Sequence, residues 1–163
     1  MCESRRAAGN NMAGPAETLS YVSRRLIQFE RRFAQSDLAR RRSASQLFTQ
    51  IGASLQSLTG DLARGGVPHD ASRELMLYST RLPEAISEEV GLQEAEKLAM
   101  TLGQAADKEK IYRQFHASDR PQDLSEELEK AAILIQALAN GIYMAPLPEE
   151  GGRIQDGSAR PAA

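Results

Sequence analysis

Arginine is the residue type with the clearest capacity for chemistry in this sequence, because several arginines are spaced for one helical face. The set is Arg24, Arg25, Arg31, Arg32, Arg40, Arg41 and Arg42. The first four recur at an interval of seven residues, beside a seam that carries Leu19, Leu26 and Phe33. Guanidinium groups bind carboxylates and phosphates. We therefore predict that this arginine stripe binds a partner, with a solvated helix face as the alternative.

The charge distribution leaves two kinds of partner open for the stripe. Residues 1–45 contain nine arginines and four acidic residues, whereas the remainder contains 11 basic and 18 acidic residues. The basic part can dock on the acidic part of the same chain, or it can bind an external acidic protein or nucleic acid. Tyr21, Phe29 and Phe33 lie on or near the seam, so we expect them to be buried. The stripe then has no aromatic platform for nucleic acid bases.

Catalytic side chains are not grouped in this way. His69 belongs to a predicted turn, and His116 lies near a predicted helix end. No spacing links either histidine to Cys2 or to a particular serine, as nucleophilic catalysis requires. Tyr112 and Asp119 lie four residues before and three residues after His116, so a small polar cluster is one interpretation, although not the favoured one. A histidine at a helix end also has the plain role of meeting the helix dipole. We assign no catalytic residue and predict that the protein is not an enzyme.

Metal and cofactor sites are not indicated either. The acidic residues gather in two clusters, 84–96 and 123–129, without the Glu-x-x-His pairs of di-metal bundles. Cys2 is the single cysteine, which excludes an intrachain disulfide and a cysteine-based zinc site. Gly65 and Gly66 lack the lysine and hydroxyl residue that would follow in a phosphate loop. We predict no metal and no cofactor.

The composition favours helices. The chain has 163 residues, no tryptophan and an aliphatic set of apolar residues with few valines, whereas strands draw on aromatic and β-branched residues. No run approaches 18 apolar residues, so no transmembrane helix is expected. The N-terminus lacks a secretory signal, and its acidic residues argue against a transit peptide. We expect a cytoplasmic protein, with the nucleus or an organelle interior left open.

The most apolar helix is predicted from Pro121 to Ala145. Its buried face is predicted to consist of Leu124, Leu128, Ala131, Ile135, Leu138 and Ile142. Pro121 suits the first helical position, Asp123 and Glu126 have capping-box spacing, and Pro146 stops the helix. This helix must pack against others.

Further helices are predicted upstream. Residues 16–42 carry a coiled-coil-like seam, which resumes at Leu47, Ile51, Leu55, Leu58 and Leu62. The two seams form either one long helix or two helices with a bend near residues 36–45. Glycines and a proline at 65–68 end this unit. Asp70 is predicted to cap a helix over 71–81, which Pro83 breaks. A helix over 84–116 follows, interrupted near Gly91 or Gly103, and a turn at 117–120 leads into the last helix.

The predicted fold is an all-α bundle of four or five helices over residues 16–145. Residues 1–15 and 146–163 are predicted to be disordered tails. The predicted function is that of a protein-interaction module, an adaptor or assembly subunit, which binds another protein through its apolar helix seams or the arginine stripe; a homo-oligomer fits the same pattern. The alternatives are a nucleic-acid-contacting subunit of a larger particle and an enzyme whose site is assembled from scattered residues.

Overall fold

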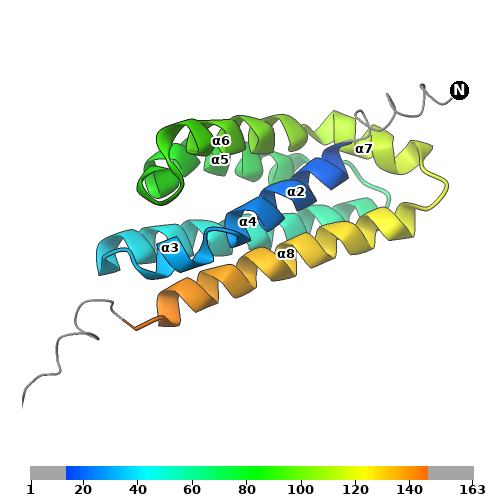
Figure 1. Ribbon diagram of the computed structural model, residues 1–163. Helices are drawn as coiled ribbons and strands as arrows, with labels where there is room; N and C mark the ends of the chain where they lie inside the picture. Colours follow the sequence, from blue (N-terminus) through cyan, green and yellow to red (C-terminus); the bar gives the residue numbers. More distant parts are fainter. Residues whose placement is uncertain (1–13, 147–163) are drawn as a thin grey trace, which may run out of the picture.

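The computed structural model describes residues 14–146, and all of the regular secondary structure in this range is helical (Figure 1). Its helices are α2 (Pro15–Ile27), α3 (Glu30–Ala34), α4 (Leu38–Ala63), α5 (His69–Val90), α6 (Leu92–Ala105), α7 (Lys108–Ala117) and α8 (Pro121–Met144). The predicted all-α class is confirmed. The predicted count of four or five helices was too low, because short breaks divide two of the predicted helices. The tails predicted at 1–15 and 146–163 lie almost wholly outside the described residues.

The long helices form two packed pairs. Helices α4 and α8 run side by side, and α5 and α6 fold back on each other (Figure 1). Helix α2 crosses from the second pair to the first, so that it contacts both α6 and α8. The core between them is aliphatic, with an edge-to-face pair of rings from Phe33 and Phe48 at 5.3 Å. No described helix is both long enough and apolar enough to span a bilayer.

The basic N-terminal part consists of three helices. The chain breaks after Ile27 and again between Ala34 and Leu38, and α4 then continues without interruption to Ala63. The predicted bend near 36–45 therefore lies at the start of that range. Asp37 marks it, because its carboxylate accepts a hydrogen bond of 3.0 Å from the backbone N–H of Arg40 and caps α4. Residues 40–43 are polar but remain helical, because Arg40 and Arg41 make tertiary contacts that are described below.

One prediction about α5 was wrong. Pro83 lies inside α5 rather than at its end, because the buried side chains of Leu82 and Ile86 hold the helix against the core on both sides of it. Gly103 lies inside α6, and an added methyl group there would approach the Ser79 hydroxyl to 3.0 Å. This glycine permits the close approach of α6 to α5 and does not interrupt the helix. The predicted interruption near Gly91 is confirmed, with φ at +93°.

The helix ends show which capping signals are used. Asp70 does not cap α5, which begins one residue earlier. Asp107 does cap α7: its carboxylate accepts hydrogen bonds from the N–H groups of Lys110 and Glu109, and these lower its pKa. This cap divides the helix predicted over 84–116 a second time.

Helix α8 spans nearly the predicted range. Pro121 is in its first turn, but the capping box does not form, since Asp123 pairs with Arg120 at 2.9 Å. Leu128, Ala131, Ile135, Leu138 and Ile142 are buried as predicted, and Leu124 is half-buried.

Candidate functional site

The arginine stripe is divided by contacts within the chain. On α2, Arg25 donates a 2.8 Å hydrogen bond to the Glu94 carboxylate of α6, and Arg24 lies 3.6 Å from Glu127 of α8. Arg32 donates to the backbone carbonyl of Glu89 at 3.3 Å. The guanidinium groups of Arg25 and Arg32 also lie over the ring of Phe29, at 4.9 and 5.8 Å from its centroid. Part of the basic charge therefore docks on acidic helices of the same chain.

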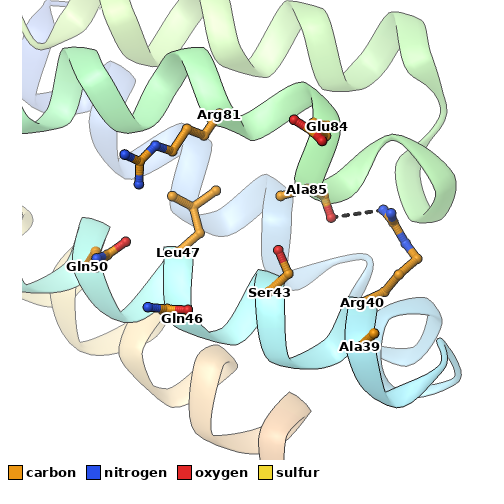
Figure 2. Close-up of a pocket in the computed structure, with 9 residues that line it drawn as sticks. All are labelled: Ala39, Arg40, Ser43, Gln46, Leu47, Gln50, Arg81, Glu84 and Ala85. Carbon is orange, nitrogen blue, oxygen red and sulfur yellow. Dashed lines mark hydrogen bonds between the residues drawn. The ribbon is translucent and has the colours of Figure 1, made fainter.

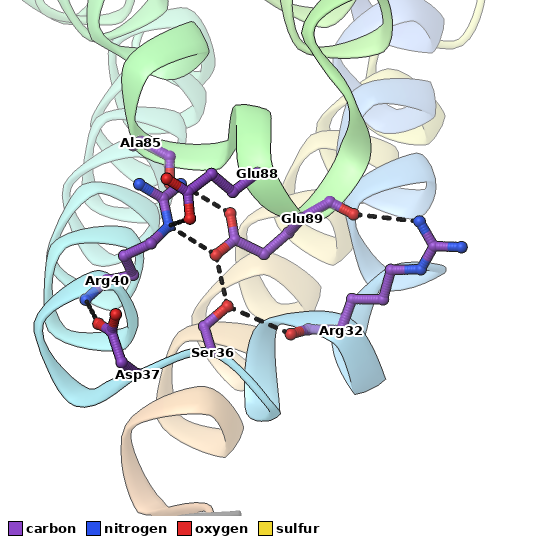
Figure 3. A network of polar contacts seen from close by, with 7 residues as sticks. All are labelled: Arg32, Ser36, Asp37, Arg40, Ala85, Glu88 and Glu89. Atoms are coloured by element: carbon purple, nitrogen blue, oxygen red, sulfur yellow. Dashed lines mark hydrogen bonds and ion pairs between the residues drawn. The ribbon is translucent and has the colours of Figure 1, made fainter.

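Arg40 makes the strongest of these contacts (Figure 3). Its Nε and Nη2 atoms each donate a 2.8 Å hydrogen bond to one oxygen of the Glu89 carboxylate, which is the two-pronged geometry that suits a guanidinium group. Nη2 also donates to the carbonyl of Ala85 at 2.9 Å, and Glu88 lies 3.3 Å from Nε. Ser36 donates to the same Glu89 carboxylate. One carboxylate thus joins the end of α5 to the start of α4.

The charge state of Glu89 follows from this arrangement. Its side chain is almost fully buried, at 5 % exposure. Burial by itself would raise the pKa of Glu89, but the hydrogen bonds from Arg40 and Ser36 outweigh it and hold the pKa below its ordinary value. The same pair raises the pKa of Arg40. Both groups are therefore ionised at neutral pH, and they neutralise each other.

Arg41 is not on the surface at all. Its side chain is 2 % exposed, and its guanidinium group donates to the last carbonyls of α8, including those of Ile142 at 3.0 Å, Tyr143 at 3.4 Å and Ala145. Carbonyls at a helix C-terminus lack the usual helical donors and carry the negative end of the dipole. That of Ile142 also accepts a 3.4 Å hydrogen bond from the backbone N–H of Ala145. The guanidinium contact ties the start of α4 to the end of α8, and it removes Arg41 from the predicted binding surface.

Two arginines of the stripe remain without a partner. Within residues 14–146, neither Arg31 nor Arg42 forms a hydrogen bond or ion pair, and both side chains are exposed. They lie on different helices, α3 and α4. The surface left for phosphates or an acidic partner is smaller than the regular spacing of seven residues predicts.

A polar cleft of about 500 Å³ lies between α4 and α5 (Figure 2). Leu47 lies among its polar lining, while Gln46 and Gln50 come from α4 and Arg81 and Glu84 from α5. Its one hydroxyl, from Ser43, has no histidine near it in the lining. The cleft can hold water or a small polar molecule, and its ionisable lining consists of Arg40, Arg81 and Glu84.

The polar cluster at His116 forms only in part. Its Nε2 atom and the Tyr112 hydroxyl are 2.6 Å apart and exposed, but Asp119 contacts neither ring. Among residues 14–146 no group of three histidine, cysteine or carboxylate side chains is arranged to hold a metal ion.

An uncharged surface over α4 and α8 is the feature that the spacing of arginines did not indicate. The sequence has no charged residue at 43–60 or at 131–146. Ten exposed or half-exposed residues of these two stretches lie on one side of the α4–α8 pair. They are Gln46, Thr49, Ala53, Gln56, Gly60, Ile133, Gln136, Ala137, Asn140 and Met144. We call this set the uncharged face.

The two helices contribute to one continuous surface. Gln56 donates a 3.5 Å hydrogen bond to Gln136, and a methyl group added at Gly52 would lie 2.5 Å from the Gln136 side chain. A shallow cleft of about 380 Å³ is lined from α4 by Gln56, Gly60 and their neighbours, and from α8 by Ile133 and Glu129. Ile133 and Met144 protrude, at 59 % and 75 % exposure.

Comparisons with protein families, with curated proteins and with solved structures found no match to this chain. Its function has to be inferred from its own surfaces.

Proposed function

We propose that this protein is a non-enzymatic helical interaction module, an adaptor or assembly subunit, and that its contact surface is the uncharged face of α4 and α8. The observation that carries the proposal is the absence of charge from residues 43–60 and 131–146 in a chain of which 26 % is charged. Folding alone requires apolar residues on the buried side of each helix. It does not require that the outward side lack lysine, arginine, aspartate and glutamate.

The composition of the face suits a protein interface. Interface cores are depleted of charged residues and enriched in methionine and other large apolar side chains. Ile133 and Met144 supply the apolar area, and Ala53, Gly60 and Ala137 allow another helix to approach closely. Glutamine and asparagine at the remaining positions can form hydrogen bonds without the desolvation cost of an ion.

The arginine stripe gives less support to binding of nucleic acid. Arg25 and Arg40 are paired with carboxylates, and Arg41 is buried against backbone carbonyls. A phosphate would have to displace these partners or bind to Arg31 and Arg42 alone. The ring of Phe29, which could stack on a base, is half-buried and lies beneath two guanidinium groups.

A photo-crosslinking amino acid tests the proposal in the native cell. Placed at Ala53 or Ala137, it should give discrete covalent adducts; placed at Gln93 or Gln104, which are exposed on α6, it should not. Equal labelling from all four positions, or none from the first two, would overturn the proposal. Retention on heparin that falls steeply with salt, and that is lost in an R31Q/R42Q variant, would favour a nucleic acid partner instead.

A further inference from the structure

We propose that the uncharged face is covered by a second copy of this chain, in a two-fold dimer in which α8 of each copy lies over α4 of the other. This inference rests on the proposed function, because it names the occupant of the same surface.

The lack of charge favours self-association over binding of a charged partner. In a two-fold interface one patch meets itself, so a charge near the axis faces its own like charge. A patch without charge avoids this repulsion. The outward side of α5 could not pair in the same way, since Arg73, Arg81, Glu84 and Glu88 are exposed along it. Over the described residues, the uncharged face spans two long helices without a formal charge.

The shape of the face is also complementary to itself. Helices α4 and α8 are antiparallel: Ser45 donates to Ala139, Gln56 meets Gln136, and Gly60 shares a cleft with Ile133. A two-fold axis between the helices and parallel to them preserves these levels. Gln136 lies beside Gly52 and Gln56, and Ile133 is one turn before it, level with Gln56. The axis therefore brings the protruding Ile133 of one copy to the Gln56 position of the other. The face ends at Gly60, where a methyl group would lie 3.4 Å from the Arg64 guanidinium group and where Glu129 lines the shared cleft.

The rest of the sequence offers no better cover for the face. The described chain ends at Pro146, beside the Arg41 end of the α4–α8 seam. Residues 147–163 contain Leu147 and Ile154 as their large apolar residues, together with Glu149, Glu150, Arg153, Asp156 and Arg160. Residues 1–13 are similarly short of large apolar side chains. A charged segment would lose hydration on an uncharged surface without gaining an ionic partner.

Sedimentation velocity of the purified full chain over a dilution series tests the inference. The parent should sediment as a dimer that dissociates on dilution. Ile133→Glu and Ala53→Glu should each weaken the dimer about tenfold or more, because they place a carboxylate in the interface. Gln104→Glu adds the same group to α6 and should leave the dimer unchanged. All of these side chains are exposed, and a thermal melt of each diluted variant confirms that it folds.

A mixing experiment tests the orientation. The variants Ile133→Glu and Gln56→Lys should each be largely monomeric, while an equimolar mixture should recover a heterodimer, since the proposed axis places one substituted position over the other. Equal recovery with Thr49→Lys, two turns away on the same face, in place of Gln56→Lys would overturn the orientation.

The outcomes separate this inference from the proposed function. A parent chain that stays monomeric at every concentration, while Ala53 and Ala137 crosslink to a different protein, overturns the dimer and leaves the interaction module standing. A monomer without adducts overturns both. A dimer that tolerates Ile133→Glu and Ala53→Glu but dissociates on substitution elsewhere overturns the inference about the face.

Discussion

Two contact regions of this bundle are built from different chemistry. Where α3 ends and α4 begins, the helices are joined to the end of α5 by charge, through Arg40 and Glu89. Helices α4 and α8 are joined instead by apolar side chains, by a close approach at Gly52 and by the hydrogen bond from Ser45 to a backbone carbonyl. The charged contacts cluster at helix ends, where directional bonds hold a change of chain direction. Between residues 43–60 of α4 and 131–146 of α8, the seam and its outer surface contain no charged residue, and Arg41 lies at its end.

The largest expected effect comes from placing a charge inside the uncharged seam. Ile135→Asp buries an unpaired carboxylate on the core side of α8, at a cost on the order of 5 kcal/mol or more, which is comparable to the stability of a domain of this size. We expect the helical circular-dichroism signal and the cooperative melt to be lost. Lys130→Asp changes an exposed position of the same helix and should move the melt little. If Ile135→Asp and Lys130→Asp melt at similar temperatures, the side chain of Ile135 lies in solvent and the prediction is wrong.

Removing one partner from the charged region should have the next largest effect. Glu89→Gln leaves the partly buried Arg40 without its bidentate carboxylate, and we expect a loss of about 3 kcal/mol in the free energy of unfolding. The neighbouring Glu88→Gln affects an exposed carboxylate and should change stability by about 0.5 kcal/mol or less. Urea denaturation of both variants measures the difference. Equal losses would mean that the burial of Glu89 does not increase the contribution of this ion pair to the free energy of unfolding.

The single arginine at the end of the uncharged seam should also matter for folding. Arg41→Leu fits an apolar site but removes the guanidinium donors from the carbonyls at the end of α8, so we expect a loss of about 2 kcal/mol. Arg42→Leu, at an exposed site without a partner in residues 14–146, is the matched control and should leave the urea midpoint nearly unchanged. An unchanged urea midpoint in Arg41→Leu would show that water donates hydrogen bonds to those carbonyls instead.

The hinge between α5 and α6 depends on backbone conformation alone. Gly91 has φ at +93°, and an added methyl group there would meet no atom within 4 Å, so Gly91→Ala tests strain without a clash. We expect a loss of about 2 kcal/mol in unfolding free energy. Gly66→Ala, at a glycine without positive φ, is the control, and differential scanning calorimetry compares them. A stable G91A variant would mean that the hinge can relax to negative φ.

The smallest expected effect is a pH dependence confined to the charged region. The pKa of Glu89 is lower in the folded chain than in the unfolded chain. Its contribution to stability is therefore complete above the unfolded value of about 4.3 and is lost as the pH falls through the folded value. The stability of the parent should fall more steeply than that of E89Q as the pH drops below about 4. Parallel acid titrations of the two proteins would contradict this assignment.

Several features of the fold were readable from local sequence. The apolar periodicity of α8 predicted five of its buried residues, the glycine pair at 65–66 predicted the end of α4, and Gly91 predicted a break. These signals depend on neighbouring residues along one helix, so they appear in the sequence. The stop expected at Pro83 failed because packing on both sides of a proline can hold a helix together despite the lost hydrogen bond.

The sequence by itself determined the helical class, the core face of each long helix and the regular spacing of the arginines. Only the tertiary structure decided what those arginines do, because a guanidinium group takes its role from whichever carboxylate or carbonyl the fold brings near it. Arg41 and Arg42 are adjacent in the chain, yet one is buried on the end of α8 and the other faces solvent. The two charge-free stretches were present in the sequence as well, but they are about 90 residues apart. Their union into one surface required α4 and α8 to pack side by side (Figure 1).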